Sequence, residues 1–430
     1  MDIEKIALAA KKAQINNSGS SGEVRKRALG NICRALTQNK EEIFCANLKD
    51  VQRSTAEGLS APLLKRLKFD EAKLRDVVFG IETLIDMPDP VGKILDATVL
   101  DDGLELYKVS CPIGVIGVIF ESRPDALVQI SALCLKSGNS VILKGGSEAR
   151  ESNRILASII HDAAVDAGIS EGWLGLLESR QDVDRMLMLD DHIDLLIPRG
   201  SNEFVRYIMD NSRIPVLGHA DGICHCFVDE YADLDMAQDV VEDSKLQYTA
   251  VCNALETLLV HEAVAKEFLP LIKKRFDKKD VVIYGCDKTR SIIDCEKADE
   301  NTYRREYLDY AISVKVVGSL KEAIDHINTY GSGHTDAIIT DNKKNASEFV
   351  SYVDSGNVFV NCSTRFSDGF RYGFGAEVGI STNKIHARGP VGIEGLMIYK
   401  YKLIGSGQTV KDYAEGTKKF KHKKINGEEK

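Results

Sequence analysis

The chain has 430 residues, 43% of them hydrophobic and 28% charged, which is the composition of an ordinary globular protein. This length exceeds one compact core, so we expect two or three domains. The formal net charge of −9 argues against nucleic-acid binding, because the chain has no basic excess to neutralise phosphates.

The sequence also indicates a cellular compartment. Ten cysteines are spread along the chain and lack the dense pattern of a disulfide scaffold, so we expect reduced thiols. Residues 1–6 show no basic segment followed by an apolar run, so no signal peptide is expected. No uncharged apolar stretch reaches the roughly 18 residues of a membrane span. We therefore predict a soluble cytoplasmic protein with no membrane partner.

The N-terminal part is predicted to be helical, and a hairpin follows it. Residues 2–90 have helical periodicity, and the apolar stripe of residues 71–86 ends at Met87-Pro-Asp-Pro90. Residues 94–110 instead alternate around Asp102-Gly103, which predicts a β-hairpin. A lone hairpin is marginal, so we expect it to pair with another element, such as a second subunit.

Two further regions alternate buried strands with helices. In residues 111–200 we predict strands at 113–120, 140–143 and 192–197, and helices at 124–136, at 147–168 and from Ser201. In residues 223–360 we predict strands at 224–228, 257–260, 312–317 and 357–360, and helices at 233–247, 262–275, 320–329 and 344–353. This pattern predicts an α/β fold with two doubly wound domains, whose ligands bind at the carboxyl ends of parallel strands.

The C-terminal part differs in composition. It is rich in glycine and polar residues up to Gly395, a strand is expected at 396–404, and the lysine-rich end is polar. Arg365 and Arg371 stand among glycines and hydroxyls, a mixture that suits a loop around a small anion. A flexible surface loop is the alternative.

Two strand-to-helix turns are candidate dinucleotide loops. The first contains Lys144, Gly145, Gly146 and Ser147. Its glycines let a ligand approach the backbone, and the next helix offers its positive end. The second contains Gly200 and Ser201, with Ser201 as the helix N-cap. The Gly-x-Gly-x-x-Gly fingerprint is absent, so a plain turn remains the alternative for each loop.

Cys252 is the candidate nucleophile. It lies between a helix-like segment and an apolar run that is typical of a strand, where a thiol can face a cleft and attack an acyl carbon. The alternative is a small buried hydrophobe, which describes most free cysteines. Cys224-His225-Cys226, with His219 nearby, suggests a metal site, but on a strand His225 faces away from both cysteines. We therefore predict no metal.

Five stretches together resemble the aldehyde dehydrogenase superfamily and, within it, the γ-glutamyl phosphate reductase family. They are residues 111–125, 143–149 (Leu-Lys-Gly-Gly-Ser-Glu-Ala), 214–222, 251–257 (Val-Cys-Asn-Ala-Leu-Glu-Thr) and 375–394. The resemblance implies a dinucleotide-binding domain at 1–93 and 111–222, a catalytic domain at 223–393, a β-hairpin and strand oligomerisation element at 94–110 and 394–412, and a polar tail at 413–430. The chain would then form a homo-oligomer, either a dimer or a tetramer.

The resemblance also implies a reaction, in which NADPH reduces L-glutamyl 5-phosphate to L-glutamate 5-semialdehyde, with release of phosphate, in proline biosynthesis. Cys252 would attack the acyl phosphate and form a thioester, with Ser122 standing where relatives have an amide oxyanion donor. Glu306 matches the residue that holds the nicotinamide ribose. Candidates for gripping the substrate are Arg123, Arg365 and Arg371. A separate glutamate kinase, whose product is labile, would be a partner.

Two departures from the superfamily pattern refine this prediction. Members that hydrolyse their thioester carry a glutamate base in a Glu-Leu-Gly-Gly motif, which Val216-Leu-Gly-His-Ala220 matches here without a carboxylate. Such a loss fits a thioester that reacts with phosphate instead of water. Ser147 replaces a glutamate of NAD-preferring relatives, which favours NADPH. The alternatives are a non-phosphorylating NAD(P)-dependent aldehyde dehydrogenase and an inactive scaffold.

Overall fold

The computed structural model describes residues 2–179, 181–219, 221–374 and 377–425. The N-terminal region is helical, as predicted, and consists of α1 (Ile3–Asn17), α2 (Gly22–Gln38), α3 (Lys40–Ala56), α4 (Ala61–Leu67) and α5 (Glu71–Asp86). Polar side chains fix where helices begin: the Asp70 carboxylate, for example, accepts a hydrogen bond from the N–H of Lys73 at the start of α5.

The first parallel sheet has the strand order β5-β4-β3-β6. Its elements are β3 (Val115–Phe120), α6 (Pro124–Lys136), β4 (Ser140–Lys144), η1 (Ser147–Ala149), α7 (Arg150–Asp166), β5 (Leu174–Leu177), α8 (Gln181–Met186), β6 (Leu195–Arg199) and α9 (Asn202–Asn211). The predicted alternation is confirmed, although β5 was not predicted. The helix expected from Ser147 begins at Arg150, because Asp50 accepts hydrogen bonds from the N–H groups of Glu151 and Ser152.

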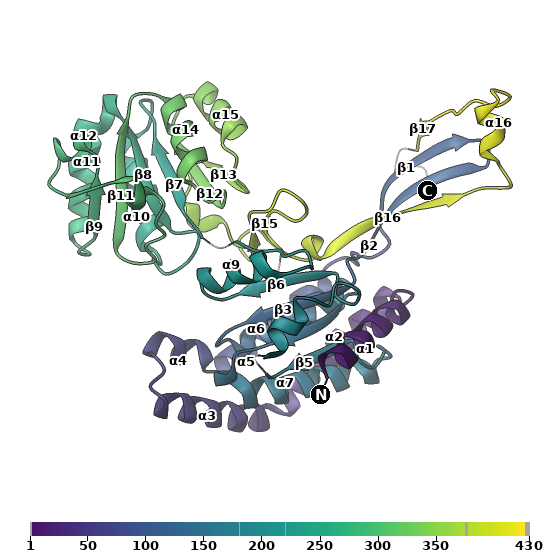
Figure 1. Cartoon of the computed structure of the whole chain (residues 1–430). Helices are drawn as coiled ribbons and strands as arrows, with labels where there is room; N and C mark the ends of the chain where they lie inside the picture. The colour runs from purple at the N-terminus through teal and green to yellow at the C-terminus, as the bar shows by residue number, and fades with distance from the viewer. Residues whose placement is uncertain (1, 180, 220, 375–376, 426–430) are drawn as a thin grey trace.

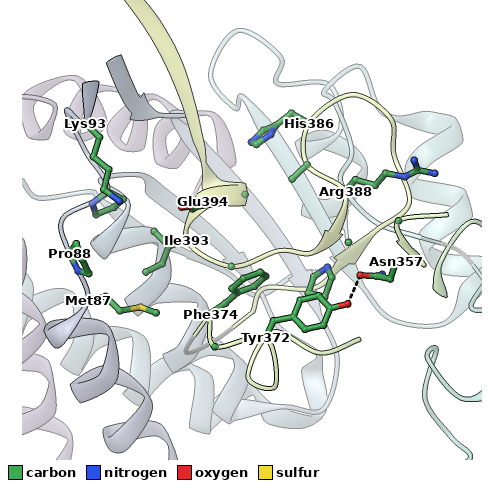
Figure 2. A pocket seen from close by; sticks show the side chains of 18 residues that line it. Met87, Pro88, Lys93, Asn357, Tyr372, Phe374, His386, Arg388, Ile393 and Glu394 are labelled. Carbon is green, nitrogen blue, oxygen red and sulfur yellow. Dashed lines mark hydrogen bonds between the residues drawn. The ribbon is translucent and has the colours of Figure 1, made fainter. Parts of the chain in front are cut away.

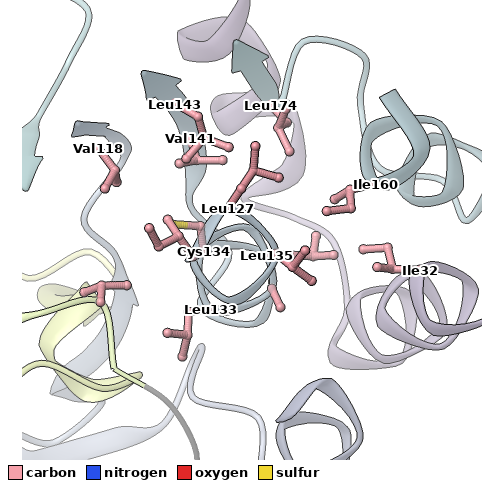
Figure 3. Packing of buried hydrophobic residues seen from close by; sticks show 14 of the residues in the cluster. Ile32, Val118, Leu127, Leu133, Cys134, Leu135, Val141, Leu143, Ile160 and Leu174 are labelled. Carbon is pink, nitrogen blue, oxygen red and sulfur yellow. The ribbon is translucent and has the colours of Figure 1, made fainter. Parts of the chain in front are cut away.

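α6 lies at the centre of the first core (Figure 3). On one side it packs against the sheet, represented by Val118 and Leu143, and on the other against Ile32 of α2 and Ile160 of α7. Leu127 of α6 is fully buried in this layer. Burial of each such side chain contributes roughly 1.5–3 kcal/mol. The packing therefore fixes the strand ends from which the candidate loops leave.

The second parallel sheet has the strand order β10-β9-β11-β8-β7-β12-β13. Its strands are β7 (Cys224–Val228), β8 (Leu255–His261), β9 (Val282–Gly285), β10 (Glu296–Lys297), β11 (Ala311–Val317), β12 (Thr335–Ile339) and β13 (Asn357–Val360). Its helices are α10 (Leu234–Leu246), α11 (Glu262–Asp277), α12 (Asp287–Arg290), α13 (Glu300–Tyr303), α14 (Leu320–Tyr330) and α15 (Lys343–Tyr352). Two doubly wound sheets were predicted, whereas β9, β10 and β12 were not.

The segment after β13 runs back from the second sheet to the first. It contains η2 (Thr364–Phe366), the short pair β14 (Ile380–Ser381) and β15 (Gly389–Pro390), and η3 (Glu394–Leu396). Asn383 donates a side-chain hydrogen bond to the carbonyl of Val216, on the segment after α9. The return segment therefore contacts both halves of the molecule.

An antiparallel sheet projects from the body of the molecule (Figure 1). Its order is β16-β2-β1-β17, formed by β1 (Ile94–Asp101), β2 (Leu104–Pro112), β16 (Met397–Ile404) and β17 (Lys423–Lys424), with α16 (Val410–Ala414) beside it. The predicted hairpin thus pairs with the late strand of its own chain. None of the helices that the structure describes has the length and apolar character that a membrane crossing requires.

Candidate active site

Cys252 lies on the turn between α10 and β8, as predicted, and its side chain is half-buried. The return segment holds this turn, because Asn253 Nδ2 donates to the Ser367 carbonyl at 2.7 Å and Thr364 Oγ1 donates to the Asn253 carbonyl at 2.8 Å. Gly222 packs on the turn from another direction, since a Cβ there would lie 2.2 Å from the Cys252 carbonyl oxygen. Two separate segments therefore fix the position of the thiol.

The two parallel sheets contribute opposite ends of their strands to the site. Lys144 ends β4 and Arg199 ends β6, so the first sheet contributes its carboxyl ends, as predicted. The second sheet contributes amino ends, since Cys252 precedes β8, Cys224 begins β7 and His334 precedes β12. The thiol therefore lies at the end of its sheet opposite to the one that the carboxyl-end rule predicts. Its backbone is bound there by Cys224, whose Sγ donates to the Cys252 carbonyl at 3.2 Å.

Two histidines lie beside the thiol. One ring nitrogen each of His219 and His334 and the sulfur of Cys252 all lie within 4.8 Å of one another. The two rings meet edge to face, with centroids 4.9 Å apart. His219 Nδ1 is 2.9 Å from the Ile380 carbonyl oxygen, and burial lowers the pKa of His219. At neutral pH this imidazole is therefore uncharged and can accept a proton or bind a cation.

The Cys224-His225-Cys226 segment does not converge on one point. His225 Nδ1 lies 3.1 Å from Asp336 Oδ1, inside the second sheet. Burial raises the pKa of both the Cys224 and Cys226 thiols, which keeps them protonated. Within the described part of the chain, the side chains that do have metal-ligand spacing are His219, Cys252 and His334.

A charged cavity of about 430 Å³ lies between α5, α6 and the return segment. Arg123 and Arg199 line it, together with Asp368 and Glu377. Burial lowers the pKa of Arg199 and Arg123 adds to this, whereas Glu377 and the Cys252 thiol oppose it. Arg199 therefore lies within electrostatic range of the candidate nucleophile. Asp76 of α5 lines it as well, and a cavity with two guanidinium and three carboxylate groups suits a small ligand that carries both charges.

Sequence reasoning assigned no role to Arg199 or Glu377. Arg199 was read only as part of a strand-to-helix turn, although its place at the end of β6 was a usable signal. Burial raises the pKa of Glu377, and Arg199 works against this. Arg123 donates to Asp125 at 3.1 Å and leaves the rest of its guanidinium facing the cavity.

The two arginines of the return segment have different environments. Arg365 is buried, and its Nε donates to Gln247 Oε1 at 3.0 Å. Burial lowers the pKa of Arg365, Arg371 adds to this, and the Cys252 thiol opposes it. Arg371 is exposed and donates to the backbone carbonyl of Arg365. Arg365 follows Thr364, whose Oγ1 bonds the Asn253 carbonyl beside the thiol, and Arg371 supports Arg365 from outside.

The candidate cofactor turn after β4 is joined to the turn after β3. Glu148 Oε1 accepts hydrogen bonds from the N–H of Ser122 at 2.6 Å and from its hydroxyl at 2.7 Å. Lys144 is buried, and its Nζ donates to the Gly145 carbonyl at 2.6 Å. A Cβ on Gly145 would lie 2.1 Å from Asn153 Nδ2, so local packing already requires this glycine.

Glu306 is brought to the second candidate turn. Asn202, the first residue of α9, donates to Glu306 Oε2 at 2.6 Å and to Asp221 Oδ1 at 2.9 Å. The Ser201 hydroxyl caps α9 by accepting from the N–H of Phe204 at 3.4 Å. Burial raises the pKa of Glu306, while Asn202 lowers it. Glu306 therefore lies at the start of α9, beside the Gly200-Ser201 turn.

Known proteins match the whole chain. A model described as the aldehyde dehydrogenase family matches residues 1–287. A γ-glutamyl phosphate reductase from Acetivibrio thermocellus is 65% identical over 426 residues, covering 99% of each chain. A crystal structure of γ-glutamyl phosphate reductase from Thermotoga maritima is 40% identical, with a TM-score of 0.93 over 95% of this chain and 100% of that one. The chain belongs to the γ-glutamyl phosphate reductase family.

More distant structures share the fold alone with this γ-glutamyl phosphate reductase family member. An acetylating aldehyde dehydrogenase from Geobacillus thermoglucosidasius has a TM-score of 0.66 at 14% identity, over 95% of this chain and 97% of that one. The resemblance seen in the sequence is thus confirmed for family and fold. The roles of individual residues stay predictions, and so do the domain limits. The motif at 375–394 begins with two residues outside the described part of the chain, and Ala220 of the 214–222 motif also lies outside it.

The chain of this family member also has a larger cavity, of about 570 Å³, whose lining does not include Cys252 (Figure 2). Its walls come from the linker after α5, with Lys93, and from the return segment, with Tyr372 and Arg388. Tyr372 Oη donates to Asn357 Oδ1 at 2.8 Å across one wall. None of its described lining residues is a predicted site residue, so we place the active site at Cys252 and the charged cavity instead.

Proposed function

We propose that this chain reduces L-glutamyl 5-phosphate to L-glutamate 5-semialdehyde with NADPH and releases phosphate, as a step of proline biosynthesis. The observation that carries the proposal is the position of Cys252, whose half-buried thiol lies within electrostatic range of Arg199 and Arg365. The 65%-identical relative is named a γ-glutamyl phosphate reductase, which supports the choice of substrate. The substrate carries an amino group, a carboxylate and a phosphate, which suits the mixed charges of the cavity.

In this mechanism, Cys252 attacks the acyl carbon as the thiolate. The C–O bond to phosphate breaks, and the thioester remains on the sulfur. Arg199 and Arg365 stabilise the departing phosphate, because their charges are held in a partly buried site. The Cys252 N–H is the first oxyanion donor. The Ser122 hydroxyl and N–H already bond Glu148, so Ser122 acts as a donor only if that contact opens.

The donors around the first sheet fit a dinucleotide. Lys144 and Ser147 would hold the adenosine half, the Gly200-Ser201 turn would hold the pyrophosphate at the start of α9, and Glu306 would hold the nicotinamide ribose. The α7 terminus is already occupied by Asp50, which leaves the α9 terminus for the ligand. When bound, NADPH supplies the hydride that reduces the thioester. Ser147 in place of a carboxylate is the reason for preferring NADPH.

The test is a purified-enzyme assay of glutamate 5-semialdehyde oxidation with NADP or NAD, with and without phosphate. We expect a rate that depends on phosphate and is higher with NADP. Cys252→Ser should abolish it, whereas Cys45→Ser, at an exposed position on α3, should not change it. An equal rate without phosphate would instead favour a non-phosphorylating aldehyde dehydrogenase.

We also propose a homo-oligomer, dimer or tetramer, built through the projecting sheet. Among the described strands β16 pairs with β2 alone, and it carries exposed Tyr401 and Leu403. Light scattering on Leu403→Glu should show a smaller particle than the parent chain. A cytoplasmic location is in keeping with ten free cysteines, and a separate glutamate kinase that passes on the labile substrate would be a transient partner.

A further inference from the structure

The two histidines and the thiol at the active site have the chemistry of a metal centre. His219 lies after α9, Cys252 before β8 and His334 before β12, so three separate segments bring them together. One ligand atom from each lies within 4.8 Å of the others. Ligands of a four-coordinate zinc ion, with bonds of about 2.0–2.3 Å, lie about 3.5 Å apart. A closure of about 1 Å, within reach of side-chain rotation, would complete the site.

His219 is already oriented as a metal-binding histidine would be. Its Nδ1 lies 2.9 Å from the Ile380 carbonyl oxygen, which can only accept a hydrogen bond. Nδ1 therefore carries the proton, and Nε2 keeps its lone pair. A backbone carbonyl on the far nitrogen is the usual second partner of a histidine ligand, because it fixes both the tautomer and the ring.

His334 supplies the second nitrogen from a buried position. Only 1% of the residue is exposed. Its Nδ1 lies 2.8 Å from Thr335 Oγ1 and 3.7 Å from Cys224 Sγ. Its Nε2 has no hydrogen-bond partner among the described residues. A buried polar atom of this kind generally holds a water molecule or an ion. The ring therefore has an unused coordination position, and it places one of its nitrogens within 4.8 Å of the Cys252 sulfur.

We propose that His219, Cys252 and His334 bind Zn²⁺, and that the bound metal reversibly inhibits the enzyme. Two imidazoles and a thiolate select zinc and other borderline metals over Mg²⁺ or Ca²⁺, which prefer oxygen ligands. The metal replaces the thiol proton of Cys252, which leaves to solvent as the zinc–sulfur bond forms. Three protein ligands leave a fourth position for water.

The charges around the site limit the affinity. Arg365 follows Thr364, whose Oγ1 donates to the Asn253 carbonyl beside Cys252, so its positive charge repels a dication at the site. We therefore expect binding weaker than that of a structural zinc site. A sulfur bound to zinc cannot attack an acyl carbon, so occupancy blocks thioester formation. Only this inhibition rests on the proposed function, whereas metal binding rests on the three side chains alone.

Metal binding is tested with Co²⁺, whose bond to a thiolate gives a charge-transfer absorption in the near ultraviolet. The full chain should show this band. Cys252→Ser should abolish it, and His219→Gln and His334→Gln should each weaken Co²⁺ binding at least tenfold. His161→Gln, at a half-buried position on α7 beside Asp162, is the matched control and should bind as the parent does. A parent chain without the band, or a band that both histidine variants leave unchanged, would overturn the site and leave a water as its occupant.

A second measurement needs no variant. Zn²⁺ should slow the alkylation of Cys252 by iodoacetamide at least tenfold, as read by peptide mass spectrometry, and should leave exposed Cys45 unaffected. Chelation should restore both the alkylation rate and the reductase activity. Protection of Cys252 in a chain without glutamyl phosphate reductase activity would leave the metal site standing and reject the proposed function. Unprotected Cys252 in a chain with normal activity would reject the metal site and leave the proposed function standing.

Discussion

One carboxylate oxygen of Glu148 accepts hydrogen bonds from both the backbone N–H and the hydroxyl of Ser122, at 2.6 and 2.7 Å. Ser122 has φ 44°, a left-handed conformation that costs a non-glycine residue roughly 1–2 kcal/mol. Glu148 therefore holds a strained turn after β3 and ties it to the candidate cofactor turn after β4. The same contact holds the carboxylate of Glu148, the residue that follows Ser147. The phosphate of the proposed cofactor would bind at Ser147.

Glu148→Ala should destabilise the chain by about 1–3 kcal/mol, because it removes two hydrogen bonds to a charged acceptor. Urea unfolding measures the change. Glu151→Ala is the matched control: its carboxylate bonds exposed arginines at the surface, and its removal should cost less than about 0.5 kcal/mol. Adding Ser122→Gly should recover part of the loss, because glycine adopts positive φ freely. Parent-like stability of Glu148→Ala would contradict this account of the turn.

Gly222→Ala should impair catalysis without touching the substrate. Its Cβ would lie 2.2 Å from the Cys252 carbonyl oxygen and 2.5 Å from the Cys252 Cα, so the backbone that carries the thiol must move. We expect kcat to fall at least tenfold with a smaller change in KM, and stability to drop by about 1–3 kcal/mol. Gly19→Ala, which meets nothing within 4 Å, is the control. Unchanged kcat in Gly222→Ala would show that the position of this turn is not critical.

Arg199→Met should raise the KM for the acyl phosphate by at least tenfold, because the variant keeps the packing of the side chain and loses its charge beside the thiol. Steady-state kinetics on the purified variant measure this. Arg154→Met is the control, because it makes the same change on the exposed face of α7. Arg154 pairs there with Glu178 at 2.7 Å, and its substitution should leave KM unchanged. Equal effects of the two substitutions would remove Arg199 from the substrate site.

Sequence patterns predicted the parts of the structure that depend on local order. The junction that carries Cys252 follows from a helical stretch next to an apolar run, and both sheets follow from the alternation of elements. β12 was missed because it begins with the polar residues Thr335 and Asp336. They are buried in the fold, where for example the His225 N–H on β7 donates to Asp336 at 2.7 Å. Such pairing joins residues far apart in the chain and leaves no local periodicity.

The same reason explains which site residues were missed. Arg199 can be identified as a site residue only because it lines the same cavity as Arg123 and Glu377. These two residues lie on two other segments of the chain. His334 precedes a strand that was not predicted, so nothing in the sequence brought it to Cys252. Contacts between residues of two different sheets can be identified only from the three-dimensional fold.

Lys245 and Glu256 form a buried ion pair that brackets the nucleophile. Their side chains are fully buried, 2.8 Å apart, one near the end of α10 and the other near the start of β8, on either side of Cys252. Lys245→Met leaves a buried carboxylate without its cation, which costs about 3–5 kcal/mol. Lys245→Met with Glu256→Gln should recover most of this loss. Urea unfolding of the single and double variants measures both changes.

The pH dependence of Lys245→Met has a definite sign. Burial raises the pKa of Glu256 from its ordinary 4.5 to about 7, and Lys245 opposes the rise, so its removal raises that pKa further. The folded chain then keeps a proton that the unfolded chain releases, and its stability falls as pH rises through the folded pKa. Both folded chains keep this proton below about pH 6, so the difference in stability between parent and variant should be constant there and should widen from about pH 7 upward in urea unfolding. A difference that stays constant above about pH 7 would mean that removal of Lys245 leaves the pKa of Glu256 unchanged.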